Sequence, residues 1–167
     1  MLCASAGVAT RCIKSVFRRP LSALNPANSA NHSWGITSMT SVSNDPEHFL
    51  RIAEQHLKKV RKACAERDWS DIGTYGLYCL EALVRAAALK SGETPIRNHW
   101  GKADQATNLH KKHGLPDIHD LLKDLNVLRK AIAYGDEECD ESDYDAEDIG
   151  HQVEDYYDKV SAFVKLK

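Results

Sequence analysis

An arginine and a tyrosine lie five positions apart in residues 125–136 (LNVLRKAIAYGD). The guanidinium of Arg129 is a strong donor to phosphate oxygens. The phenol of Tyr134 is a poor general base, because about one part in a thousand is phenolate at pH 7, which costs proton transfer roughly 4 kcal/mol. An arginine of this kind suits the binding of an anion, and the tyrosine suits proton transfer only weakly. The structural alternatives are a cation that complements the end of a helix and a boundary aromatic with a packed ring.

A third candidate group is a carboxylate inside an apolar segment. From residue 75 to residue 89 the only charged side chains are Glu81 and Arg85. A buried carboxylate needs a partner. One candidate is Arg85, four residues further along the same helix, and the other is Arg129 from a neighbouring helix. In the second arrangement Glu81 orients the guanidinium of Arg129.

Basic and aromatic residues are mixed between residues 93 and 114. Lysine and arginine bind phosphates and a tryptophan ring stacks on a base, so this stretch contains the best candidates for contact with nucleic acid: Arg97, Trp100, Lys102, Lys111 and Lys112. His110 and His113 have a spacing that suits a metal pair. The flanking lysines repel a cation and no cysteine lies nearby, so we expect no metal site and no cofactor.

The elements that position these residues are predicted to be helices. Asp45 and Pro46 form a helix start, and apolar residues then recur at spacings of three and four up to Cys64. The pattern restarts near Trp69, and the apolar segment 75–89 predicts a central, buried helix. Residues 93–114 allow at most a short helix.

The second half of the sequence predicts two further long helices. One opens at Pro116 and ends near Tyr134 and Gly135, and after an acidic loop over residues 136–145 the other is capped by Asp145. No segment alternates with period two, so no sheet is expected. We therefore predict an all-α fold for residues 45–167, a four-helix up-down bundle with a short extra helix.

Residues 125–136, together with the tyrosine-rich segment 75–83 (YGLYCLEAL), resemble the HEPN superfamily of small all-helical proteins. The signature of that superfamily is an arginine followed, four to six residues later, by a histidine. By this resemblance Arg129 occupies the arginine position and Tyr134 stands in place of the histidine. The similarity extends over about residues 46–165. It implies a homodimer, because many of these proteins cleave RNA without a metal across a homodimer cleft.

The resemblance implies two main functions. In the first, the chain is a catalytically impaired binding or regulatory module that contacts RNA, a nucleotide or a partner protein through a groove around Arg129, Tyr134 and Glu81. In the second, it is a toxin-like, metal-independent ribonuclease in which Arg129 stabilises the phosphate. The proton is then handled by Tyr134 or by a histidine from elsewhere, the candidates being His110, His113 and His151. A further possibility is that Tyr134 accepts a nucleotide from a partner nucleotidyltransferase.

Residues 1–44 differ in composition from the rest of the chain. They contain four basic residues and none of the 24 acidic ones. One interpretation is a disordered or mis-assigned extension, with Met39 as an alternative start, and the protein is then expected in the cytoplasm. The other is a transit peptide over residues 1–38, which implies a mitochondrial or other organellar location.

The overall composition excludes several classes of protein. No run of about 18 apolar residues is present, so no membrane span is expected. The five cysteines have no regular spacing and do not indicate a disulfide framework. We expect Cys64 and Cys79 to pack in the core. With 22 basic and 24 acidic residues, the chain is not a strongly basic protein that coats nucleic acid.

Overall fold

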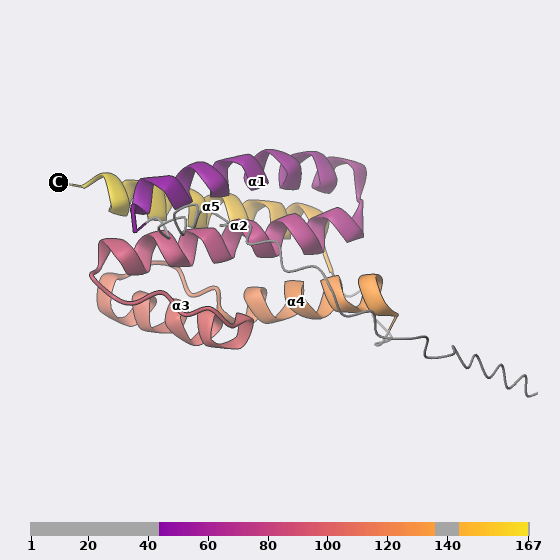
Figure 1. Cartoon of the computed structure of the whole chain (residues 1–167). Helices are drawn as coiled ribbons and strands as arrows, with labels where there is room; N and C mark the ends of the chain where they lie inside the picture. Colours follow the sequence, from indigo (N-terminus) through magenta and orange to yellow (C-terminus); the bar gives the residue numbers. More distant parts are fainter. Residues whose placement is uncertain (1–43, 136–143, 167) are drawn as a thin grey trace, which may run out of the picture. The chain divides into compact units, whose positions relative to one another are not determined.

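The computed structural model describes residues 44–135 and 144–166, and these ranges contain five α-helices and no strand. The helices are α1 (Pro46–Glu66), α2 (Trp69–Lys90), α3 (His99–His113), α4 (His119–Tyr134) and α5 (Ala146–Lys165) (Figure 1). All five belong to one unit of the chain, Thr40–Lys167. The predicted all-α fold is confirmed. The expectations for residues 1–43 and for the acidic loop up to residue 143 lie outside the described residues.

Three of the helices begin at an aspartate that caps free backbone amides. The side chain of Asp45 accepts hydrogen bonds from the amides of Glu47 (2.9 Å) and His48 (3.2 Å), and Asp145 caps α5 in the same way, as predicted. Asp68 caps α2. Because α1 ends at Glu66 and α2 begins at Trp69, only two residues connect them.

The centre of the bundle is α2, which contacts each of the other four helices. Its side chains are buried along almost its whole length, as the apolar segment predicts. Figure 1 shows α1 and α5 on one side of α2, and α3 and α4 on the other. Since α4 packs on α2 and α3, the position of Arg129 depends on these two neighbours.

The sequence prediction is wrong about the length of α3. Instead of a short helix at most, α3 has 15 residues and is nearly as long as α4. Asn98 caps its start, and Gly114, at a φ of 69°, ends it. Its buried face consists mainly of Ala103, Ala106 and Leu109, which is a weak hydrophobic signal for a helix of this length. The following helix, α4, begins at His119, three residues after Pro116.

Two glycines of α2 allow α4 to approach closely. A Cβ atom at Gly73 would lie 3.1 Å from the backbone nitrogen of Arg129 and 3.2 Å from Leu128 Cγ. At Gly76 the nearest atom would be a side-chain methyl of Leu125, also at 3.1 Å. The contact at Gly73 therefore determines how far the backbone of Arg129 lies from α2.

Candidate functional site

Arg129 is half-buried on α4 and is held by a neighbouring amide. Its Nη2 donates a hydrogen bond to Oδ1 of Asn126 at 3.2 Å, and Asn126 is itself buried. The Nε of Arg129 is also buried and has no hydrogen-bond partner among the described residues. A donor in this state gains free energy when an acceptor reaches it. The guanidinium is therefore fixed at one end by Asn126 and has an unused donor at Nε among the described contacts.

Tyr134 is the last residue of α4 and is 64% exposed. On an α-helix, side chains five positions apart point about 140° away from each other around the axis. Arg129 and Tyr134 therefore leave α4 in different directions. Arg129, Tyr134 and Glu81 do not line the cavities described below, and the groove around them stays a prediction.

Glu81 binds neither of the two arginines that the sequence suggested. Its carboxylate oxygens bind Nδ1 of His99 and Nζ of Lys102, the latter at 2.6 Å, and both partners belong to α3. Glu81 is only 9% exposed, and the side chain of Lys102 is 14% exposed. The guanidinium of Arg85 lies instead over the ring of Phe49, 4.2 Å from its centroid. Both predicted pairings of Glu81 are wrong, since Glu81 joins α2 to the start of α3.

An exposed tryptophan lies between the two residues that Glu81 binds. The side chain of Trp100 is 54% exposed. Two lysines of α4 approach its ring, with Nζ of Lys123 at 6.0 Å and Nζ of Lys130 at 5.8 Å from the centroid. Neither lysine has an ion pair with a carboxylate among the described residues. Together, Trp100, Lys123 and Lys130 form a surface, here called the tryptophan–lysine surface.

The other basic residues proposed from the sequence lie in different environments. Lys102 is neutralised by Glu81, and Lys112 pairs with Glu93 at 2.7 Å. Lys111 is exposed and lines a cavity with acidic neighbours, and Arg97 is exposed in the segment before α3. The structure therefore brings Trp100 together with lysines of another helix rather than with Lys102, Lys111 or Lys112.

Among the described residues, no contact joins His110, His113 or His151, the three candidate proton donors, to Arg129 or Tyr134. Nδ1 of His110 lies 2.7 Å from the carbonyl oxygen of Leu115. The ring of His113 packs against Phe163 with centroids 5.1 Å apart. His151 lines a cavity between the end of α1 and the start of α5, and Arg129 and Tyr134 are not part of its lining. No group of three or more potential metal-binding side chains is present in the described ranges.

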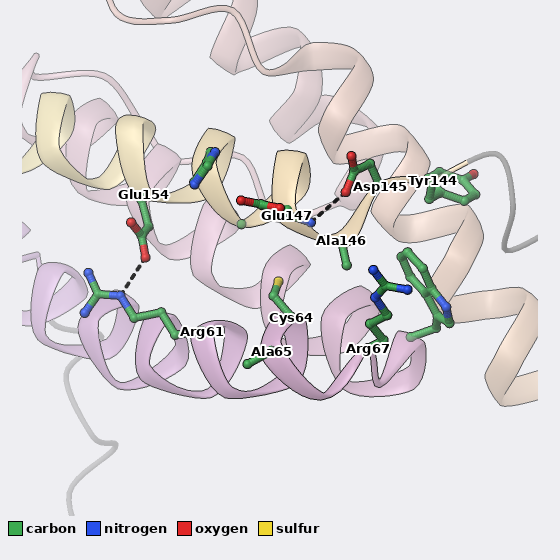
Figure 2. A pocket seen from close by; sticks show the side chains of 12 residues that line it. Arg61, Cys64, Ala65, Arg67, Tyr144, Asp145, Ala146, Glu147 and Glu154 are labelled. Carbon is green, nitrogen blue, oxygen red and sulfur yellow. Dashed lines mark hydrogen bonds and ion pairs between the residues drawn. The ribbon is translucent and has the colours of Figure 1, made fainter.

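A cavity of about 930 Å³ lies between the end of α1 and the start of α5 (Figure 2). Some of its polar side chains bind one another or the backbone. Nε of Arg61 donates to Glu154 at 2.7 Å, and Asp145 accepts from the amide of Glu147 at 2.9 Å. The cavity thus presents charges of both signs, and Arg61 and Glu154 are paired with each other. Cys64 lies at its wall, where burial raises the pKa of the thiol.

Four residues of the candidate site were missed from the sequence: His99, Lys123, Asn126 and Lys130. Lys123 and Lys130 are seven residues apart, which places them on one face of α4 two turns from each other. That spacing was visible in the sequence. The fact that this face meets Trp100 was not, because it depends on how α3 packs against α4.

Comparisons with known proteins agree with the all-helical architecture. No helix in the described ranges is long and apolar enough to cross a membrane. The search of curated proteins finds no match. The sequence profile of the HEPN domain matches residues 46–162, which span α1 to α4 and most of α5. The chain therefore belongs to the HEPN domain family.

Proposed function

We propose that this HEPN chain is an RNA-binding module that contacts phosphates through α4 and does not cleave the strand. The observation that carries the proposal is the tryptophan–lysine surface, where two ammonium groups with no ion pair among the described residues flank an exposed aromatic ring. Single-stranded nucleic acids are held by this combination, because lysines bind the phosphates and aromatic rings stack on the bases. Arg129 directly precedes Lys130 and adds a third cation.

The proposed lack of cleavage rests on the chemistry around Arg129. A general base should titrate near the working pH, and a phenol does not. Tyr134 also points away from Arg129, so it cannot easily reach a phosphate that Arg129 holds. Arg129 alone can bind a phosphate and stabilise charge, but it does not remove a proton from a ribose hydroxyl.

A second candidate function, metal-independent cleavage of RNA, is favoured by one contact. The carboxylate of Glu81 binds Nδ1 of His99, and in the neutral tautomer that carries its proton on Nδ1 the Nε2 of the imidazole is an acceptor. This arrangement suits a general base. However, Glu81 lies eight residues beyond Gly73, the residue that contacts the backbone of Arg129. Eight residues correspond to about 12 Å along a helix, so His99 and Arg129 of one chain serve different phosphates, and shared catalysis needs a second copy of the chain.

The test measures binding of the full chain to a fluorescent single-stranded RNA in EDTA. We expect Lys123→Ala and Lys130→Ala each to weaken binding about five- to tenfold, since each removes one charge-assisted phosphate contact. Lys111→Ala is the matched control, because Lys111 is an exposed lysine of α3 outside the tryptophan–lysine surface. Equal losses for all three variants would contradict the proposal.

The same samples are then resolved on a denaturing gel. We expect the RNA to remain intact. Cleavage in EDTA that disappears in both Arg129→Ala and His99→Ala would establish the second candidate function instead. Light scattering on these proteins measures whether the chain is a homodimer, the state in which His99 and Arg129 of different copies can meet.

A further inference from the structure

We infer that Trp100 is a preformed stacking site for one unpaired base, and that Glu81 is the residue that holds it in position. The inference rests on the proposed binding of RNA and adds the class of ligand, a single strand with an accessible base. Glu81 is a positioning residue, since it acts on the ligand through α3.

The ring of Trp100 is available to a ligand. Trp100 is more than half exposed, so a base can approach its ring from solvent. The ammonium groups of Lys123 and Lys130 lie at the outer limit of a cation–π contact, which is about 6 Å. They are therefore loosely held. When a base stacks on the ring, the phosphate of the same nucleotide gives these lysines a stronger partner.

Glu81 fixes the first turn of α3 from a rigid support. It lies in the middle of α2, the most buried helix, and its two carboxylate oxygens bind different residues. These residues, His99 and Lys102, are the first and fourth of α3 and lie on either side of Trp100. Two anchors on opposite sides of one residue restrict both the position and the rotation of the backbone that carries the ring.

A second buried side chain holds the segment that leads into α3. Gln105 donates from Nε2 to the carbonyl of Thr94 at 3.1 Å and accepts at Oε1 from the amide of Ile96 at 3.1 Å. Gln105 of α3 thus holds the segment that precedes Trp100. The first turn of α3, which contains Trp100, is held by Glu81 of α2. A ring held in this way loses little further freedom when a base stacks on it, and affinity is improved by such preorganisation.

Because Glu81 is negatively charged, its role can be tested by whether its removal strengthens or weakens the binding of RNA. By electrostatics alone, removal of a carboxylate near a phosphate-binding surface strengthens binding of RNA, because the local positive charge increases. A positioning role predicts the opposite. When Glu81 no longer holds His99 and Lys102, the start of α3 becomes mobile, the ring is no longer preorganised and binding weakens.

The experiment compares Glu81→Gln with Glu93→Gln in the full chain. Both variants remove one negative charge that pairs with a lysine of α3, but Glu93 pairs with Lys112, far along α3 from Trp100. Affinity is measured for a single-stranded RNA and for a fully paired duplex of the same sequence. We expect Trp100→Ala and Glu81→Gln each to weaken single-strand binding by about tenfold, the scale of one lost stacking contact. We expect Glu93→Gln to bind as tightly as the parent or more tightly.

A second readout follows Trp100 without RNA. The chain has three tryptophans, so Trp34→Phe and Trp69→Phe leave Trp100 as the only one. In this background, Glu81→Gln should change the acrylamide quenching of Trp100 and Glu93→Gln should not. If Glu81→Gln reduces the helical circular dichroism signal, His99→Ala is used in place of Glu81→Gln. This variant removes one of the two anchors at an exposed position. We expect it to change the quenching of Trp100 in the same direction.

Three outcomes overturn the inference. Equal affinity for duplex and single strand excludes a site for an unpaired base, while binding of RNA through the lysines still stands. Tighter binding by Glu81→Gln, with unchanged quenching of Trp100, excludes the positioning role. If the parent chain binds neither RNA, the proposed function fails, and with it the base site.

Discussion

His56 lies among aromatic side chains between α1 and α2. Its ring is 6.0 Å from that of Tyr75 and 5.7 Å from that of Tyr78, measured between centroids, and its Nδ1 is buried without a hydrogen-bond partner among the described residues. Burial lowers the pKa of His56 below the ordinary value of 6.5, and the nearby charge of Lys59 lowers it further. The folded protein therefore favours the neutral imidazole.

This environment predicts that stability falls in mild acid. Below pH 6.5, His56 takes up a proton in the unfolded chain before it does so in the folded protein, so the free energy of unfolding decreases as the pH falls. We expect His56→Phe, which keeps an aromatic ring, to flatten this dependence between pH 6.5 and about pH 5, above the range of most carboxylates. Urea unfolding at several pH values measures the slope. If the free energy of unfolding depends on pH with the same slope in parent and variant, groups other than His56 cause the pH dependence.

The residue types at the site were easier to predict from the sequence than their partners. Arg129, Trp100 and Glu81 were recognised because a cation, an exposed aromatic and a carboxylate in an apolar helix each suggest a specific chemistry. The partners of Glu81 depend on how α3 is rotated against α2, and periodicity within one helix contains no information on that rotation. For the same reason His99 was overlooked, and the roles of Arg129 and Tyr134 stay predictions.

At the scale of elements, the distance between α2 and α4 depends on Gly73. A methyl group there would meet backbone atoms of Arg129, which cannot turn away, whereas at Gly76 it would meet the flexible end of Leu125. Both glycines have ordinary helical backbone angles, so an alanine would otherwise favour the helix.

We therefore expect Gly73→Ala and Gly76→Ala to change the free energy of unfolding by clearly different amounts. Gly73→Ala should lower the free energy of unfolding by about 1–3 kcal/mol, the usual cost of overpacking, and should weaken RNA binding because Arg129 is displaced. Gly76→Ala should be nearly neutral, since the gain in helix propensity offsets a small movement of Leu125. Chemical denaturation of the two variants provides the comparison. A larger loss for Gly76→Ala would refute this account of the helix contact.

The starts and ends of helices were largely predictable because capping chemistry is local. Asp45, Asp145 and Gly135 act where the sequence placed them, and each requires only a few neighbouring residues. The length of α3 was not predictable in this way. Its buried face has only one large apolar side chain, Leu109, and its first turn contacts Glu81 of α2, so the helix has only a weak hydrophobic pattern of its own and also makes distant contacts.

At the scale of the whole molecule, the formal net charge of −2 means that RNA binding must be local. Only the cations on α4, Lys123, Arg129 and Lys130, are proposed to contact phosphates. For a single strand, each phosphate contact contributes about −0.7 to the slope of log K against log salt concentration, so three contacts predict a slope of about −2.

Titrations of RNA at several salt concentrations measure this slope. We expect it to become shallower by about 0.7 in Lys130→Ala, which removes one contact. Lys111→Ala should leave it unchanged. A parent slope several times steeper would indicate that a much broader basic surface, not the end of α4, meets the RNA.

The two-residue connection between α1 and α2 has a consequence for how the protein acquires this surface. Closing a short loop costs little chain entropy, so pairing of α1 with α2 is the contact that a folding chain reaches most rapidly. The helices that carry Trp100 and Arg129 follow later in the sequence and dock on a hairpin that already exists. The tryptophan–lysine surface is thus a late product of folding, and a chain that stops at the first helical hairpin has none of it.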